Sequence, residues 1–392
     1  MQLFKLGRLM AVCLAVWWAH YPCDLLGETA SFSEPNLDRW MYPFNGTPGT
    51  RTTAPLFGSL DGDPSFDQRD AQLLLGFNTA SGGTTSIPTG QGSANYAISA
   101  ATVTLTVAGG DFKYDPTYDA RDTYVSVADG DLGRPIELYG AAFRNGYSTL
   151  SFGSNDDVPP GYEETSPFSP PGPPSAGARH VFAADIDSGG SLRDVSNNVL
   201  DGFDPLPFSV GQTSLSAGST VPLGTTYTFA LNLANADVRA YLQEALDSGV
   251  LGLVATSLSA ASFGGPPTYP IFYTRDHATG AAPTLVIEWG LLGDMDGDGD
   301  RDNFDIEPFE LALTDSDAYL EEYPALTNYA LFGDIDGDGD FDNFDIEPFE
   351  ALLTGGPGAP LAVPEPSAFV LAMIGAAAVF SDRHQRKRRT IR

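Results

Sequence analysis

The residues with the clearest chemistry are alternating aspartates in two stretches that begin forty residues apart, at Gly293 and Gly333. Sixteen of their eighteen positions are identical. Carboxylates at every second position repel one another unless a cation lies between them. Hard oxygen donors of this kind are the ligands that Ca²⁺ prefers. The duplication therefore predicts two calcium-binding loops, one ion in each.

The spacing fits a loop of the EF-hand type, which takes ligands from positions 1, 3, 5, 7, 9 and 12 and turns at a glycine in position 6. Counted from the first aspartate of each stretch, position 6 is Gly299 or Gly339. Position 7 normally gives its backbone carbonyl, so the side chains of Asp300 and Asp340 are expected to contribute negative field. The candidate metal residues are Asp294, Asp296, Asp298, Asp300, Asp302 and Asp305, and Asp334, Asp336, Asp338, Asp340, Asp342 and Asp345.

Each loop is expected to run into a helix. Asp305 and Asp345 are the expected N-caps, and a proline follows in each first turn, where it costs no hydrogen bond. A further helical segment is expected over residues 315–322. Residues 284–289 before the first loop have the pattern of a strand, so no entry helix is predicted there. The expected apolar faces comprise Phe309, Leu311 and Leu313, then Phe349, Leu352 and Leu353.

A calcium loop with an exit helix and no entry helix, repeated twice, resembles the dockerin type I module. That resemblance implies that the aspartates at positions 1, 3, 5, 9 and 12 hold calcium and that the module docks a cohesin-like protein. Two features depart from the module's pattern. Position 8 is Arg301 or Phe341 instead of a small aliphatic residue, and positions 10 and 11 are Asn-Phe at 303–304 and 343–344 instead of Ser/Thr-type residues.

The N-terminus has the layout of a secretory signal peptide, with two basic residues ahead of an apolar run over residues 9–19. We predict a signal peptide over residues 1–30, with cleavage near Ala30. Cys13 and Cys23 are the only cysteines and lie in or beside this segment. The exported protein would then carry neither a disulfide nor a thiolate metal site.

The C-terminus contains a Pro-Glu-Pro motif, an apolar segment and a basic tail. The apolar segment predicts a transmembrane helix over residues 367–381, and the basic residues of 382–392 would lie on the cytoplasmic side. This order of elements resembles the PEP-CTERM sorting signal. The resemblance implies export in a Gram-negative-type bacterium, transient anchoring in the membrane and processing by an exosortase-type enzyme. The sorting motif comprises Pro364, Glu365 and Pro366.

The segment over residues 31–290 is expected to be one β-sandwich, followed by the calcium module over 291–355 and a linker over 356–366. Apolar and β-branched runs recur in it between turn residues, which is typical of antiparallel sandwiches. A Pro-rich stretch over 156–176 predicts a long loop, and a helix is predicted between Asn235 and Gly249. The expected strands cover residues 72–77, 100–107, 123–127, 135–139, 180–182, 226–232, 250–254, 270–273 and 284–289.

The order of parts in this segment also resembles the jelly-roll-like β-sandwich modules called DNRLRE domains. The resemblance is carried by Leu-Leu-Leu-Gly-Phe at 73–77, by the strand pattern after Ile98 and by the closing segment 275–289. It implies an extracellular bacterial protein that binds polysaccharide.

Composition bears on the remaining classes of function. A net charge of −31 repels phosphate, so nucleic acid is not an expected partner. After loss of both ends the histidines are His180 and His277, and no Gly-x-Ser-x-Gly motif occurs, so triad hydrolysis and a His/Cys zinc site lack residues. A glycosidase with two carboxylates leaves no local signature and stays an alternative. Further acids, read as solvated turns or a minor calcium site, are Asp115, Asp119, Asp122, Asp185 and Asp187.

Together these patterns predict a non-enzymatic, calcium-binding protein of the cell-envelope surface or extracellular matrix. The alternative is a polysaccharide-binding protein, or part of a carbohydrate-active enzyme, with a dockerin-mediated protein partner.

Overall fold

The computed structural model describes residues 28–42, 49–58, 68–125, 130–144, 148, 181–261 and 265–354. The Pro-rich loop, the linker with its Pro-Glu-Pro motif, the expected transmembrane segment, the basic tail and residues 1–27 of the expected signal peptide lie outside these ranges. Within them, no helix combines the length and the apolar character needed to cross a bilayer.

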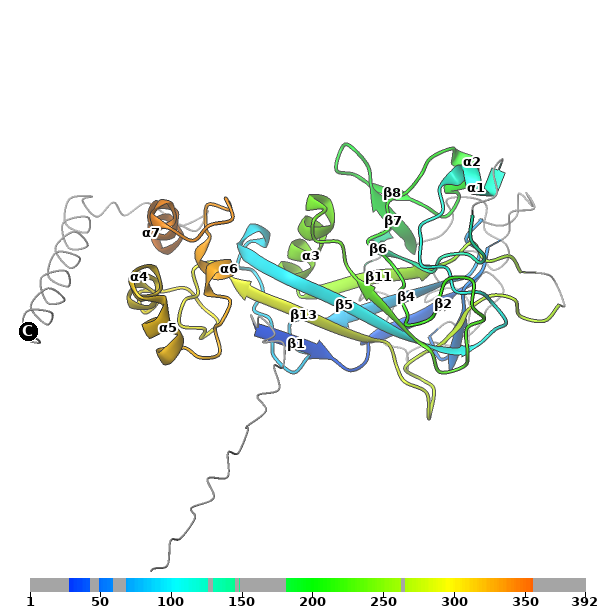
Figure 1. The fold of residues 1–392 in the computed structure, drawn as a ribbon, viewed down its shortest axis with the longest axis horizontal. Coiled ribbons are helices and arrows are strands. Elements are labelled where there is room, and N and C mark those ends of the chain that lie inside the picture. The colour runs from blue at the N-terminus through cyan, green and yellow to red at the C-terminus, as the bar shows by residue number, and fades with distance from the viewer. Residues whose placement is uncertain are drawn as a thin grey trace, which may run out of the picture.

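Two sheets form the body, and every pair of strands within them is antiparallel (Figure 1). The sequence prediction of a mainly antiparallel β body is thereby confirmed. The first sheet has the order β1 (Glu28–Phe32), β13 (Thr284–Leu291), β5 (Tyr96–Gly109), β12 (Ile271–Tyr273) and β3 (Thr53–Pro55), with β10 (Thr226–Ala230) also paired to β5. The second has the order β2 (Leu37–Met41), β4 (Gln72–Asn78), β11 (Val250–Thr256), β6 (Glu137–Phe143), β7 (Val181–Ile186) and β8 (Leu192–Asp194), with β9 (Ser209–Val210) beside β6.

The two sheets differ in how they are buried. Residues of β10 alternate between exposed and buried, as expected for a strand with one face in the core. Strand β4 is buried on both faces: Leu73 and Leu75 join the main core, whereas Leu74 joins a second apolar cluster with Tyr139 and Val254. The inner strands of the second sheet are therefore covered on both faces, which explains the continuous apolar runs of β4 and β11.

Helix α3 (Ala236–Ser248) confirms the helix predicted between Asn235 and Gly249. The Asn235 side chain caps it by accepting a hydrogen bond from the Asp237 N–H at 2.9 Å. Gly249 ends it with a φ of 79°, a left-handed conformation that glycine adopts at little cost. Its apolar side, including Leu242 and Leu246, packs in the main core.

The prediction of a strand over residues 123–127 is wrong. Residues 123–125 of the expected strand 123–127 belong to a single helical turn, α1 (Arg121–Val125), and the rest lies outside the described residues. The Arg121 N–H donates to a carboxylate oxygen of Asp204. The N–H and the hydroxyl of Thr123 donate to the Ala120 carbonyl at 2.9 and 2.7 Å. The two hydrogen bonds of Thr123 are local and compete with strand pairing, whereas the bond to Asp204 comes from a segment 83 residues away. Together they prevail over the β-branched pattern. A second short helix, α2 (Asn198–Asp201), contacts α1.

The first strand overlaps the boundary expected for the signal peptide. Ala30, near which we placed the cleavage, lies in the middle of β1, is fully buried and is paired with Ile287 of β13. Cleavage after Ala30 would remove three of the five residues of this edge strand. A leader that leaves the sandwich intact has to end before Glu28.

Beyond β13 the chain forms a small helical module at one end of the sandwich (Figure 1). Its helices are α4 (Ile306–Thr314), α5 (Ser316–Glu322), α6 (Tyr329–Gly333) and α7 (Ile346–Thr354), with a 3₁₀ turn at Asn343–Asp345. The helices expected after each loop and over 315–322 are confirmed, and α6 is additional. Phe309 of α4 and Phe349 of α7, which are equivalent in the two copies, stack with ring centroids 4.0 Å apart. This pair is the centre of the module's own core.

Candidate metal centres

Each aspartate-rich loop is positioned by the element before it and the helix after it. The first leaves the end of β13 and enters α4, and the second leaves α6 and enters α7. In each loop the structure brings three carboxylates together, with one oxygen from each lying within 4.8 Å of the others. The two trios are Asp294, Asp296 and Asp305, and Asp334, Asp336 and Asp345, which are positions 1, 3 and 12 of the two copies.

The other predicted ligands lie outside these trios and shape the loop through backbone hydrogen bonds. Asp298 Oδ1 accepts from the Asp300 N–H at 3.1 Å, and Asp302 Oδ1 accepts from the Phe304 N–H at 2.6 Å. In the second copy, Asp338 and Asp342 make the equivalent contacts with the Asp340 and Phe344 N–H groups, at 3.0 and 2.7 Å. Asp300 and Asp340 are exposed.

The first aspartate of each loop is held by the backbone in the same way. Asp294 accepts from the N–H groups of Gly297 and Gly299 at 2.9 and 3.1 Å. Asp334 accepts from Gly337 and Gly339 at 2.9 and 3.0 Å. The glycines at position 6 have φ values of 93° and 101°, so the sharp turn expected there is present and requires glycine.

Asp305 occupies the N-cap position expected for it at α4, but its side chain makes no cap hydrogen bond. Asp345 ends the 3₁₀ turn that leads directly into α7. Asp305 Oδ1 accepts from the N–H groups of Met295 and Asp296 at 2.6 and 3.2 Å, and its Oδ2 accepts from Asp302 at 2.8 Å. Asp345 makes the same three contacts in the second copy. The carboxylate points back into the loop because the turn presents three N–H groups there. A position-12 aspartate is thereby placed beside the other two carboxylates.

The first trio lies in a place that disfavours negative charge. Burial, followed by the nearby charge of Asp305, raises the pKa of Asp294 to about 7. Burial also raises the pKa of Asp305 to about 6, against the lowering effect of its backbone hydrogen bonds. A divalent cation between these oxygens would offset the cost of bringing them together. Hard carboxylate oxygens at this spacing fit calcium and do not suit softer metals.

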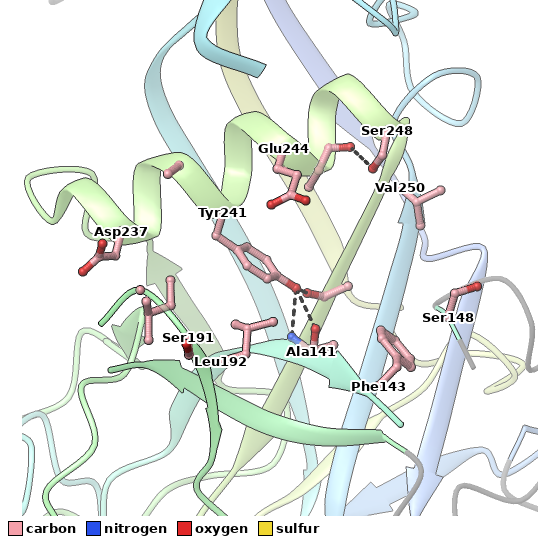
Figure 2. Close-up of a pocket in the computed structure, with 15 residues that line it drawn as sticks. Ala141, Phe143, Ser148, Ser191, Leu192, Asp237, Tyr241, Glu244, Ser248 and Val250 are labelled. Atoms are coloured by element: carbon pink, nitrogen blue, oxygen red, sulfur yellow. Dashed lines mark hydrogen bonds between the residues drawn. The ribbon is translucent and has the colours of Figure 1, made fainter. Parts of the chain in front are cut away.

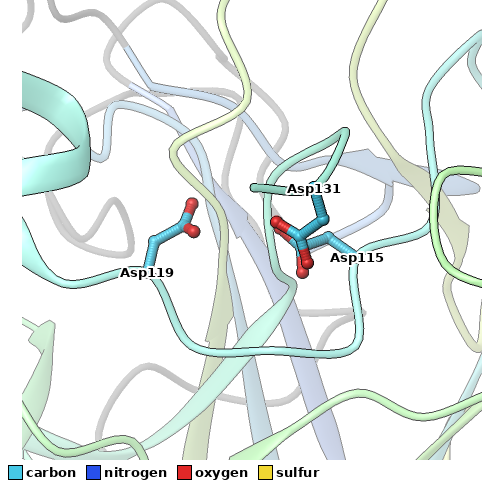
Figure 3. Close-up of side chains that lie close together, drawn as sticks. All are labelled: Asp115, Asp119 and Asp131. Carbon is cyan, nitrogen blue, oxygen red and sulfur yellow. The ribbon is translucent and has the colours of Figure 1, made fainter. Parts of the chain in front are cut away.

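A third acidic cluster lies in the sandwich and includes two of the further acids singled out in the sequence, Asp115 and Asp119. Asp115, Asp119 and Asp131 lie together, with one oxygen of each within 4.8 Å of the others (Figure 3). Asp122 is outside it and faces Arg121 at 3.9 Å.

The guanidinium of Arg134 already neutralises part of the negative charge of this third cluster. Arg134 Nη1 lies 2.8 Å from Asp119 Oδ2, and the Tyr124 hydroxyl donates to the same oxygen at 3.0 Å. Asp131 receives a hydrogen bond from the Thr117 hydroxyl at 3.0 Å. The guanidinium supplies positive charge to Asp119, so we assign no metal here. No spacing in the sequence connects Asp131 or Arg134 to Asp119.

The remaining candidate residues have structural roles. Asp185 accepts two hydrogen bonds from Arg193, at 3.1 and 2.7 Å. Asp187 organises a turn by accepting from Gly189 and Ser191. His277 Nδ1 accepts from the Gly280 N–H at 2.7 Å, whereas His180 lies outside the described residues.

A groove of about 860 Å³ runs along α3 on the second sheet (Figure 2). One wall is a face of the helix, the floor is formed by β6 and β11, and the other wall is the turn between β7 and β8. The Tyr241 hydroxyl donates to the Gly252 carbonyl at 2.6 Å and accepts from the Ala141 N–H at 3.0 Å, which joins helix and floor. Asp237 and Glu244 stand on the helix side, and no Lys or Arg is among the described lining residues. This groove could not be predicted from the sequence, because its walls come from distant segments.

Comparison with models of known protein families finds no match to this chain, and comparison with curated proteins finds none either.

Proposed function

We propose that the two aspartate-rich loops bind two calcium ions and that this binding folds the helical module at the end of an exported β-sandwich protein. The observation that carries the proposal is the repetition of one hydrogen-bonded loop geometry, with carboxylates from positions 1, 3 and 12 drawn together in both copies. The chain thus carries the same trio of hard oxygen donors twice, at the spacing that calcium loops use.

In each loop the trio would hold the ion, and the aspartates at positions 5 and 9 would complete the set of oxygen ligands as the loop closes. Calcium supplies the positive charge that lets buried carboxylates ionise together at neutral pH. The chain's own contribution is a set of backbone N–H groups that orient those carboxylates in the closed loop. Binding and folding are then one process, because the loops connect the helices that form the module's core.

Titration calorimetry of the full chain with Ca²⁺ tests the proposal. We expect two ions per chain, with weaker binding of Mg²⁺, which is smaller and gives up its water reluctantly. Absence of calcium uptake at millimolar concentrations would refute it.

The setting that we propose is the cell-envelope surface or extracellular matrix, reached through the PEP-CTERM-like signal. Support comes from the order of Pro364, Glu365 and Pro366, the apolar segment and the basic tail. An exosortase-type enzyme would process the chain after transient anchoring through the C-terminal helix. Replacing Glu365 by Ala should leave the protein in the inner-membrane fraction, whereas an unchanged distribution on cell fractionation would contradict this route.

We also propose that the module is dockerin-like, on a jelly-roll-like body, and that it presents a surface to a cohesin-like protein. Support comes from Phe304 and Phe344, which are equivalent in the two copies and both 74% exposed. Large aromatics at such exposure are typical of binding surfaces. We expect a calcium-dependent interaction with a purified cohesin, and we expect the double variant Phe304→Ala/Phe344→Ala to abolish it. Lack of any interaction with the wild type would refute a cohesin-like partner.

A second candidate function is polysaccharide binding, and the groove along α3 favours it. Hydroxyls of Ser191 and Ser248, carboxylates and the Tyr241 ring line the groove, and its described lining residues include no Lys or Arg. Such a lining suits a neutral sugar chain better than an acidic one. Ala240→Arg would fill the groove, whereas Ala236→Arg lies on the same helix outside it. We expect only the first variant to lose signal on a glycan array. An array without any signal would refute polysaccharide binding. A reducing-sugar assay tests separately whether the protein hydrolyses a glycan.

A further inference from the structure

The first calcium loop is joined to the sandwich without a linker. Only Leu292 and Gly293 separate the last residue of β13 from Asp294, the first calcium ligand in our proposal. The Leu292 N–H donates at 2.9 Å to the carbonyl of Asn95, the residue directly before β5. The Gly293 N–H donates to the Phe332 carbonyl at 2.8 Å. The backbone that enters the loop is therefore fixed on both sides, to the sandwich and to the module.

The second loop is fixed to the same strand through α6. Phe332 is 2% exposed and precedes Asp334 by two residues. Its ring covers Gly290 of β13 so closely that a Cβ at Gly290 would collide with it. Glycine at this position is thus required by a close approach between the module and the sandwich. Helix α6 contacts both β13 and β5.

Arg301 adds a contact that its counterpart cannot make. Its Nη1 and Nη2 atoms lie 3.5 Å from the Leu292 and Gln91 carbonyls, and Gln91 belongs to the sandwich. Its counterpart in the second copy, Phe341, packs inside the module against Phe309, with ring centroids 5.1 Å apart. Position 8, where both copies depart from the usual small residue, therefore faces the sandwich in one copy and the module core in the other.

We propose that the first calcium loop is a clamp that fixes the orientation of the module on the sandwich when calcium is bound. This inference rests on the calcium binding proposed above. Asp294 and Asp305 belong to the loop that carries Arg301, and Asp294 lines the small cavity between Gly290, Phe332 and Leu326. Without a cation, repulsion among these carboxylates opens the loop and withdraws Arg301 from Gln91. With calcium the loop closes, and sandwich and module become one rigid body.

The test measures orientation and ion binding separately on the full chain. Both native cysteines are replaced (Cys13→Ser, Cys23→Ser). Dyes are then attached at Leu223→Cys in the sandwich and Glu347→Cys on α7, which are both exposed sites. We expect a narrow distribution of energy-transfer efficiencies in Ca²⁺ and a broad one in EGTA. Arg301→Met should broaden the distribution in Ca²⁺, while calorimetry still counts two ions.

Two further variants complete the design. Gly290→Val, whose side chain would displace the Phe332 ring from β13, should broaden the distribution as Arg301→Met does. Arg239→Met, which replaces an exposed arginine on α3, is the control and should leave the distribution narrow. Two outcomes would refute the clamp while two ions still bind: an energy-transfer distribution that is equally narrow in EGTA, or one that neither Arg301→Met nor Gly290→Val broadens. In both cases the calcium proposal stands. If calorimetry finds no calcium, the proposed function fails, and the clamp fails with it.

Discussion

At the scale of single residues, the charge of each carboxylate and its position in the loop determine what it contributes. Asp294→Asn keeps the shape of the side chain but removes a negative charge from the first trio. It also removes one of the two acceptor oxygens that Gly297 and Gly299 use, because an amide nitrogen cannot accept a hydrogen bond. We expect the calcium affinity of one site to fall by more than about tenfold, or about 1.4 kcal/mol. Asp300→Asn, which removes an exposed charge outside the trio, is the control and should cause a much smaller change in calorimetry. Equal losses in the two variants would show that only the general negative field matters.

A buried ion pair in the sandwich is expected to contribute to stability through charge compensation. Arg69 and Glu137 are both 1% exposed and are joined by a hydrogen bond, and Arg69 Nε also donates to Asn198 at 3.3 Å. Removing either partner leaves a buried charge without its counter-ion. Arg69→Met and Glu137→Leu should each lower the free energy of unfolding by about 3–5 kcal/mol.

The double variant of this pair should cost much less than the sum of the singles, because it buries neither charge. Urea unfolding at saturating calcium measures all three proteins. Additive losses would show that packing, and not charge compensation, holds these two residues together.

At the scale of elements, the repeated phenylalanines divide into buried and exposed sets. Phe349 is 1% exposed and stacks on Phe309, whereas Phe344, five residues earlier, is 74% exposed. Phe349→Ala should destabilise the module by about 3–5 kcal/mol. Since the loops close only when the module folds, this variant should also weaken calcium binding although it touches no ligand.

Phe344→Ala is the matched control for that variant, and its calcium affinity should equal that of the wild type. The measurement is calorimetry at 25 °C, together with the helical signal in circular dichroism as calcium is added. Unchanged affinity in Phe349→Ala would mean that the loops bind calcium independently of the helices.

The same scale shows why some elements could be predicted from the sequence. Strands β5, β10 and β13 have one face in the core and alternate accordingly, and α3 carries its cap and stop signals within its own sequence. Strand β2 was missed because it buries Asp38 and Arg39, and Asp38 accepts from the Arg275 N–H at 2.7 Å. A partner more than two hundred residues away leaves no trace in the local pattern.

The candidate sites also divide into features that a local sequence pattern predicts and features that depend on distant contacts. The ligands of each loop lie within twelve residues, so both loops could be located from spacing alone. Which way Asp305 and Asp345 turn could not be predicted, because a helix cap and a position-12 ligand use the same residue type. The groove along α3 and the role of Arg301 depend on contacts between distant segments, and only the fold shows them.

At the scale of the whole molecule, calcium is expected to stabilise one part of the chain and leave the other unchanged. In the loops, N–H groups such as those of Met295, Gly297 and Gly299 depend on aspartate side chains for their hydrogen bonds. In the sandwich, β5 and β13 are held by their own ladder and by a large apolar core. Removing calcium should therefore abolish protection from hydrogen exchange over residues 294–354 and preserve it over β5.

Hydrogen exchange with mass spectrometry, in Ca²⁺, in Mg²⁺ and in EGTA, measures this difference. We expect Mg²⁺ to restore less protection than Ca²⁺ at equal concentration, because it holds its water shell and demands a tighter octahedral geometry. Strand β13 has an intermediate position, since it pairs with β5 but leads directly into the first loop. Its last residues, Gly290 and Leu291, should lose protection in EGTA while Leu285 stays protected. Full protection of the module in EGTA would show that it folds without calcium and that the loops serve another purpose.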